Sequence, residues 1–528
     1  MDTKNNGMRE KTPAAEFTLI PDAGIADVHF LEKTVPTELS CDFTLPDYLP
    51  EIRKMLRTRA RVSPVSRYIG TGNAEFSGRV DYDIIYMCED GSLASAPLGD
   101  DFSFDLNFEL PSGAQSDDAP EIFAVVSPDS VYCRVTAPRK VNIRSRLRSE
   151  VNGYCKCDIA PTVPACKAKA ERLTETAKCT SLRHIMSEVI DLSGETRPMG
   201  ESEKAVCASG TVCVTDSAIT DGVLHCRGNL CLKILMQDGE NVRSEEVEIP
   251  FTEQIELDGD ETPCLVAGVI GKCGEIKEER SDDGKLLLDA EITLEALIAR
   301  ESEAETVSDI YIPSRKTDVS YTSFTGEKMG KCGGSIVRID EKRPFSDFSV
   351  QAQSGAAPEI IDSEMTVKTD SVSVDEGHCT INGTCRIWLL TRSGGEYAAG
   401  EVSVPFSLDT ELSAPDDASP KMFACASPVS CVCTTGADGV NCSTEIDVFY
   451  CITLPHEYRI AENVTLPCGD EITAKQSGVT IYYPHEAETL WSVSKRYGVP
   501  LRTVAELNSI SSPVGSTDVS ELGHIIIC

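Results

Sequence analysis

The chain contains 528 residues, a length that suggests about three or four domains. Asp and Glu number 85 against 49 Lys and Arg, so the formal net charge is −36, which argues against binding to nucleic acid or to an anionic membrane surface. Hydrophobic residues make up 41% of the chain and aromatic residues only 6%, so we expect packed cores built mainly from Val, Ile, Leu and Ala.

The N-terminal stretch MDTKNNGMREKTPAAEF contains no apolar run, and we therefore expect no secretory signal. The longest apolar stretch, residues 264–270, is too short to cross a bilayer, so the sequence predicts no transmembrane segment. Together these features favour a reducing cytosol as the compartment.

The 23 cysteines are spread along the chain and never form the paired C-x-x-C sets that are typical of zinc sites. The tightest pairs are Cys155/Cys157 and Cys431/Cys433, in stretches that we predict to be strands. A spacing of two puts both thiols on one face of a strand, where cysteine acts as a small buried hydrophobe. Redox or metal chemistry is the alternative. We predict no metal site and no cofactor.

Two stretches are predicted to be helices. Residues 49–56 follow the Pro46-Asp47 turn, and residues 171–190 carry Leu173, Leu182 and Ile185 at spacings that suit one helix face.

A pattern of strand, turn and strand occurs three times. The turns Asp90-Gly91, Asp238-Gly239 and Ser393-Gly394 lie 148 and 155 residues apart, and each turn precedes a Glu-Leu pair at a spacing of 19, 18 and 18 residues. Glycine supplies positive φ without steric cost, so these are predicted hairpins. The strands that follow alternate apolar and polar residues, which indicates sheets with one buried face.

We therefore predict a mainly β protein with three repeated antiparallel β-sandwich or open-barrel modules and a small C-terminal domain. The modules span residues 17–150, 171–305 and 310–460, and the second begins with the helix predicted above. The C-terminal domain spans residues 476–528 and has the order β-α-α-β.

The C-terminal domain resembles a LysM domain. The likeness lies in Thr489-Leu490-Trp491, in residues 495–499 (KRYGV), in Leu507-Asn508 and in Gly523. The resemblance implies a groove for N-acetylglucosamine polymers, or the same fold reused to bind a protein. Where the family has Gly-Asp, this chain has Ala487-Glu488, and we expect the longer Glu to intrude on the groove. The groove residues that the resemblance implies are Glu488, Thr489, Leu490, Trp491, Asn508, Ser509 and Ile510.

The remaining chain resembles the SPOCS repeats of SipL-type spore coat proteins. The marks are residues 45–52 (LPDYLPEI) and 137–144 (APRKVNIR). The resemblance implies a morphogenetic protein in the mother-cell cytoplasm that binds the coat ATPase SpoIVA and helps to attach the coat at the forespore surface. The alternative is a peptidoglycan-binding protein of the cell wall or spore cortex.

We expect no enzymatic activity. The seven histidines are scattered, and no nucleophile elbow or phosphate-binding loop is present. His225-Cys226 and His378-Cys379 recur in the second and third repeats, but neighbours on a strand point to opposite faces, so we expect no Cys-His dyad within one repeat.

One basic stretch stands out in this acidic chain. On a strand, three of its arginines share one face. This face is either solvated, or it docks an acidic partner or the acidic face of another repeat. The residues are Arg139, Lys140, Arg144, Arg146 and Arg148.

Overall fold

The structure is a computed structural model. It describes residues 15–16, 19–21, 24–115, 118–159, 162–164, 170–257, 264–350, 357–375, 377–412, 420–436, 439–466, 478–511 and 515–528. The predicted domain boundaries at 17 and 476, and most of the N-terminal stretch, lie outside these residues.

The first of three β-sandwiches packs two antiparallel sheets around one hydrophobic core. One sheet has the order β3-β9-β8, and in the other β6 pairs with β4, β5 and β7. Alternation of apolar and polar residues along each strand buries one face of each sheet. The strands are β3 (Ile25–Thr44), β4 (Ile52–Val62), β5 (Ser66–Ile69), β6 (Asn73–Cys88), β7 (Leu93–Asn107), β8 (Glu121–Ala137) and β9 (Lys140–Asp158).

The second sandwich repeats this plan. In one sheet β17 pairs with β11, β12 and β16, and the other has the order β13-β14-β15. The two sheets share one core. The strands are β11 (Glu171–Met186), β12 (Ile190–Glu195), β13 (Lys204–Thr220), β14 (Val223–Asp238), β15 (Asn241–Glu256), β16 (Cys264–Arg280) and β17 (Leu286–Tyr311).

The third sandwich follows the same plan again. In one sheet β23 pairs with β18, β22 and the short β1, and the other has the order β19-β20-β21. The elements are β1 (Ala15–Glu16), β18 (Asp318–Arg343), the 3-10 helix η1 (Phe345–Phe348), β19 (Glu359–Asp375), β20 (His378–Ser393), β21 (Glu396–Glu411), β22 (Lys421–Gly436) and β23 (Gly439–Leu466). Two further short strands, β2 (Leu19–Pro21) and β10 (Thr162–Pro164), pair with each other.

The predicted fold class is confirmed, and so are the three predicted hairpins. They are β6–β7, β14–β15 and β20–β21, and Gly91, Gly239 and Gly394 have positive φ in their turns. In the recurring His-Cys pairs, Cys226 and Cys379 are fully buried whereas the preceding histidines are more exposed. The two side chains therefore point to opposite faces, as expected.

Both helices predicted within the modules are wrong. Residues 171–186 form strand β11, which pairs with β17 along its length and so satisfies its backbone groups. Residues 52–62 form strand β4, preceded by a turn. Register shifts between Ile52 and Lys54 and between Met55 and Arg57 interrupt the alternation of β4, so its apolar residues fall at helix-like spacings.

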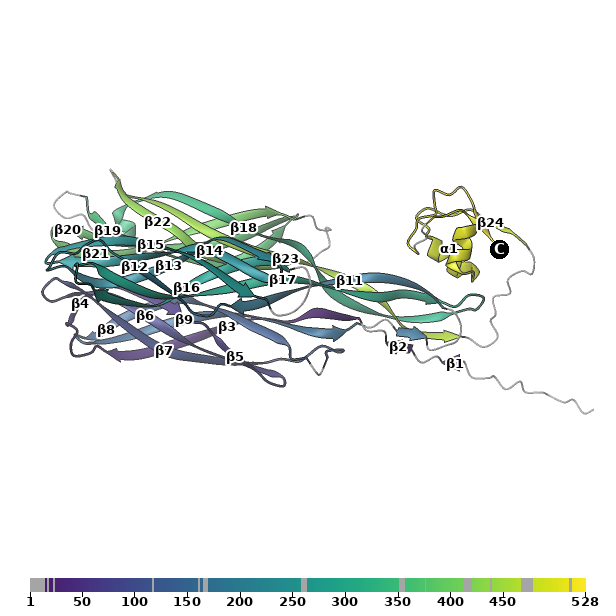
Figure 1. The fold of residues 1–528 in the computed structure, drawn as a ribbon, viewed down its shortest axis with the longest axis horizontal. Helices are drawn as coiled ribbons and strands as arrows, with labels where there is room; N and C mark the ends of the chain where they lie inside the picture. Colours follow the sequence, from purple (N-terminus) through teal and green to yellow (C-terminus); the bar gives the residue numbers. More distant parts are fainter. Residues whose placement is uncertain are drawn as a thin grey trace, which may run out of the picture.

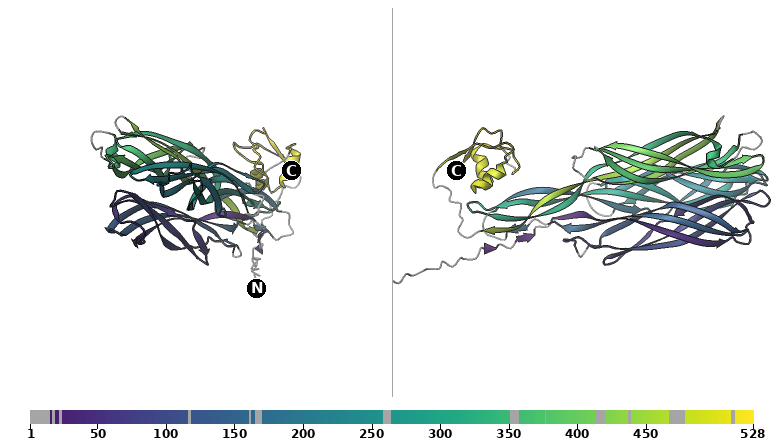
Figure 2. Two further views of the ribbon diagram at one scale, coloured as in Figure 1. Left: turned by 60° about the vertical axis from the view of Figure 1, so that its left-hand side comes forward. Right: turned by 180° about the vertical axis from the view of Figure 1, so that it is seen from behind.

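The three sandwiches lie side by side and form an elongated body (Figure 1). The ends of β11, β17, β18 and β23 continue beyond one end of the body, and we call this extension the ribbon (Figures 1 and 2). Its two strand pairs, β11–β17 and β18–β23, pack through a small cluster that includes Val307, Ile310 and Val464. The C-terminal domain lies against the ribbon, away from the body.

Equivalent residues of the three sandwiches meet between them, near the turns of the three hairpins. Met87, Leu235 and Leu390 each lie four residues before the turn glycine of their hairpin, and all three belong to one buried cluster. The body is therefore arranged as an intrachain trimer, with equivalent faces turned toward a common axis.

The C-terminal domain has the predicted β-α-α-β order. Its elements are β24 (Thr480–Tyr482), α1 (Leu490–Tyr497), α2 (Leu501–Leu507) and β25 (Ile525–Ile527), with β24 and β25 paired. Leu490, Val493, Val504 and Ile525 belong to its own buried cluster. Gly498 ends α1 with φ of 64°, as its place after the apolar face predicts.

Candidate functional site

The two loops that the LysM resemblance assigns to a groove have exposed rims. His485, Glu486 and Ala487 are exposed before α1, and Ser509 and Ser511 are exposed after α2. These loops offer mostly small or polar groups to a ligand, which suits contact with a sugar polymer.

Glu488 is folded into its own domain, and the structure does not show the intrusion expected of it. Its carboxylate accepts hydrogen bonds from the Tyr482 hydroxyl at 2.7 Å and the His485 amide at 3.0 Å, and it lies 2.6 Å from the Arg496 guanidinium. Burial alone raises the pKa of Glu488, but these contacts outweigh it and hold the pKa below its ordinary value. The carboxylate is thus an ionised anchor for the loop.

Thr489 and Asn508 also hold the domain together. Thr489 caps α1 and exchanges hydrogen bonds with Ser492 in a capping box. The Asn508 amide bonds both backbone groups of Ile526, at 2.7 and 2.8 Å, and so joins α2 to β25. Leu490 is fully buried in the domain core, and Ile510 is half-buried against it. Of the predicted groove residues, Ser509 is the most exposed.

Trp491 faces the ribbon. Its indole N–H donates to the Asp309 carboxylate at 2.7 Å, and its ring meets the Tyr311 ring edge-on at 4.9 Å between centroids. The Lys495 ammonium lies 2.6 Å from the same carboxylate, which also accepts from the Tyr321 hydroxyl at 2.6 Å. The structure therefore uses Trp491 as a docking residue between the C-terminal domain and the ribbon.

Ala487 has φ of 58°, the left-handed conformation that glycine adopts without strain. This conformation costs an L-residue about 1 to 2 kcal/mol of folding free energy. Glycine avoids that cost but gives the unfolded chain more conformational entropy, so we expect Ala487→Gly to stabilise the domain by a net amount of about 0.5 to 1 kcal/mol. The check is the urea midpoint followed by Trp491 emission in a Trp388→Phe background. Glu486→Gly, at a neighbouring residue without positive φ, should give no gain; equal gains would contradict the prediction.

The basic stretch is divided among three environments. The Arg139 guanidinium donates to the carbonyls of Leu45, Pro46 and Leu49, so the two segments that carry the SPOCS resemblance contact each other. Lys140, Arg144 and Arg146 are exposed on β9.

Arg148 lies 2.8 Å from Glu150 and lines a cavity inside the body. The three arginines of β9 share one face, but only Arg144 and Arg146 are on the exposed part of it.

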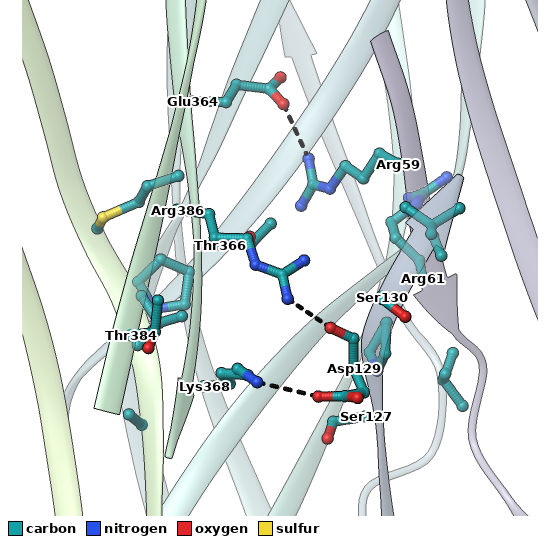
Figure 3. A pocket seen from close by; sticks show the side chains of 18 of the residues that line it. Arg59, Arg61, Ser127, Asp129, Ser130, Glu364, Thr366, Lys368, Thr384 and Arg386 are labelled. Atoms are coloured by element: carbon teal, nitrogen blue, oxygen red, sulfur yellow. Dashed lines mark hydrogen bonds and ion pairs between the residues drawn. The ribbon is translucent and has the colours of Figure 1, made fainter. Parts of the chain in front are cut away.

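A cavity of about 640 Å³ lies between the three sandwiches (Figure 3). Each sandwich contributes an equivalent residue to its lining: Arg59 from the first, Thr211 from the second and Thr366 from the third. Each of these residues is paired in register with the residue that lies eight positions before the turn glycine of its own hairpin. The cavity therefore surrounds the common axis.

Several charged side chains of the cavity already have partners. Arg59 donates to Glu364 at 3.3 Å, Lys368 donates to Asp129 at 2.9 Å, and Arg386 donates to the Asp129 carbonyl (Figure 3). Burial raises the pKa of the Cys425 thiol on its wall to about 12, which makes that thiol a weak nucleophile. These hydrogen bonds join the first and third sandwiches across the cavity.

Comparison with known proteins matches a family model to a short C-terminal part of this chain. Residues 486–514 match the family model of the LysM domain, which supports a role in binding peptidoglycan or a related carbohydrate. No curated protein and no solved structure matches the chain. In the described part of the chain, no helix is long and apolar enough to span a membrane, and no three metal-ligating side chains are grouped.

Proposed function

We propose that this chain is a non-enzymatic binding and assembly protein that presents a LysM domain to a peptidoglycan-like polymer of N-acetylglucosamine. The supporting observation is the orientation of the domain. Trp491 and Lys495 hold one side of it on the ribbon, while His485 to Ala487 and Ser509 stay exposed on the loops of the groove.

A bulky side chain on a groove loop should block this polymer. We expect Ser511→Trp to weaken retention on purified peptidoglycan at least tenfold, because the indole would occupy the exposed rim. Arg502→Trp places the same side chain on the exposed face of α2, where Arg502 is 86% exposed, and should leave retention unchanged. The measurement is a binding isotherm of the full chain, with N-acetylglucosamine oligomers as competitors.

The second candidate role is assembly of a spore coat in the mother-cell cytoplasm, at the forespore surface, through a SpoIVA-like ATPase. The contact between the 45–52 and 137–144 segments favours it, because both marks of the SPOCS resemblance belong to one structural unit. In this role Arg144 and Arg146 would dock an acidic surface. The same full-length chain, offered a purified SpoIVA-like ATPase, distinguishes the roles: retention by the ATPase alone would overturn the glycan-binding proposal, and retention by peptidoglycan alone would overturn the coat role.

A further inference from the structure

The central strand of one sheet in the third sandwich carries two cysteines, and each lies directly opposite a cysteine of a neighbouring strand. Cys442 of β23 is paired in register with Cys433 of β22, and Cys451 of β23 is paired with Cys332 of β18. Directly opposed residues of antiparallel strands have Cα atoms about 4.5 to 5.5 Å apart. This range lies within the roughly 4.4 to 6.8 Å that a disulfide bond requires.

The thiols of the first pair are also close. The sulfur atoms of Cys433 and Cys442 are 3.6 Å apart, so rotation of the side chains can bring them to bonding distance. Both pairs share a pattern of access. The cysteine on the outer strand, Cys433 or Cys332, is half-buried, and its partner on β23 is buried. A small reagent can therefore reach one thiol of each pair first.

We propose that Cys433–Cys442 and Cys332–Cys451 are disulfide-forming sites for a low-molecular-weight disulfide such as glutathione disulfide. The thiolate of the outer cysteine attacks one sulfur of the reagent and releases one reduced thiol. The thiolate of the buried partner then attacks the mixed disulfide and releases the second. Each site loses two protons and two electrons, which reduce one reagent disulfide to two thiols.

Oxidation at both sites would link β23 covalently to each of its two main neighbours. The β22–β23–β18 part of this sheet would then be cross-linked through its central strand. The ribbon is continuous with β18 and β23, so the cross-links would also stiffen the base of the element that holds the C-terminal domain.

Cys155 and Cys157 provide an internal comparison. Their sulfur atoms are also 3.6 Å apart, but both residues belong to β9. Residues two apart on one strand are separated by about 6.6 Å, close to the upper limit for a disulfide, and their side chains point in parallel directions. We therefore expect this pair to stay reduced when the cross-strand pairs oxidise.

The test is peptide mapping of the full chain after exposure to glutathione disulfide. Unreacted thiols are alkylated and the unfolded chain is cleaved before Asp residues; cuts at Asp438 and Asp447 place Cys433, Cys442 and Cys451 on separate peptides. The expected products are two cross-linked peptides, each lacking two hydrogen atoms, with Cys155 and Cys157 alkylated.

Substitutions assign each link. Cys433→Ser should abolish only the link to Cys442, and Cys332→Ser only the link to Cys451. Cys431→Ser, two residues from Cys433, should change neither. The exposed Cys528 reports that the reagent is active. Modified Cys528 together with alkylated cysteines at both cross-strand sites would overturn the proposal.

Discussion

Replacing Glu364 with Gln is expected to destabilise the junction of the three sandwiches by about 3 to 5 kcal/mol, the usual loss when one partner of a buried ion pair is removed. The Glu364 carboxylate lies 2.7 Å from the Arg57 guanidinium, and it also accepts hydrogen bonds from Arg59 and Ser209. The Arg57 side chain is only 5% exposed. Without Glu364 its charge would stay buried beside a neutral amide.

The position of this ion pair explains its importance. Arg57, Ser209 and Glu364 are paired with Ile85, Lys233 and Trp388, each of which lies six residues before the turn glycine of its hairpin.

The three contacting residues are therefore equivalent positions of the three sandwiches, brought together at the common axis. Because one is a cation, one a hydroxyl and one an anion, the contact distinguishes the sandwiches from one another. We infer that it selects this arrangement over others in which two sandwiches exchange places.

Urea unfolding of the full chain would measure the loss. The chain has two tryptophans, and Trp388 lies at this junction, with its ring centroid 5.1 Å from the Arg57 guanidinium carbon. In a Trp491→Phe background, Trp388 emission reports on the junction alone. Glu359→Gln removes an exposed carboxylate of the same strand and should have little effect. The Arg57→Met, Glu364→Met double variant should recover most of the stability; failure to recover it would contradict the ion-pair explanation.

The same group gives the junction a pH dependence. Burial alone raises the pKa of the Glu364 carboxyl, but the charges of Arg57 and Arg59 outweigh it and lower the pKa to about 2. A carboxyl with a depressed pKa stabilises the folded state fully above its ordinary value of 4.5, and this stabilisation is lost as the pH falls through about 2. The difference in stability between the native chain and Glu364→Gln should therefore shrink in acid.

Features that depend on neighbouring residues could be predicted from the sequence. The hairpin at Asp238-Gly239 depends on a glycine between two apolar runs, and the C-terminal domain depends on one short helix ended by Gly498. In both cases the residues that determine the local structure lie within a few positions of one another, so the sequence pattern shows them directly. The two incorrect helices were also predicted from the spacing of nearby apolar residues. In β4 that spacing results from register shifts, and in β11 the strand is held by pairing with the distant strand β17.

Contacts between distant segments could not be predicted in this way. Ser209 and Glu364 each lie 30 residues before the turn glycine of their hairpin, whereas Arg57 lies 34 residues before its own. The first sandwich has the extra strand β5 between these points, so the spacing does not show that the three residues are equivalent. Asp309 lies in the strand β17, among other acidic residues, and nothing near it marks it as the partner of Trp491. Such pairs become visible only when the register of every strand is known.

Asp309→Ala is expected to release the C-terminal domain from the ribbon. The Asp309 carboxylate accepts hydrogen bonds from Trp491 and Lys495 of the C-terminal domain, and hydrogen bonds to a charged group contribute about 1.5 to 3 kcal/mol each. Its third hydrogen bond, from Tyr321, lies within the ribbon and does not hold the domain. Lys495 is 29% exposed and can recover some hydration, so we expect a net loss of about 3 kcal/mol. A loss of this size shifts the ratio of docked to undocked domain about 100-fold.

Emission of Trp491 in the Trp388→Phe background would show the release, because the buried indole would become exposed to water. Glu305→Ala removes an exposed charge from the same strand and should leave the emission unchanged. Burial alone raises the pKa of Asp309, but its hydrogen bonds from Lys495, Tyr321 and Trp491 outweigh it and hold the pKa below 3.8. Docking should therefore persist above pH 3.8 and weaken as the pH falls below that value. If the domain stays docked in Asp309→Ala, the prediction is wrong, and the remaining contacts are enough to hold it. They are the ring contact between Trp491 and Tyr311 and the hydrogen bonds that the Tyr311 hydroxyl and the Ser314 amide donate to the carbonyls of Val499 and Gly498.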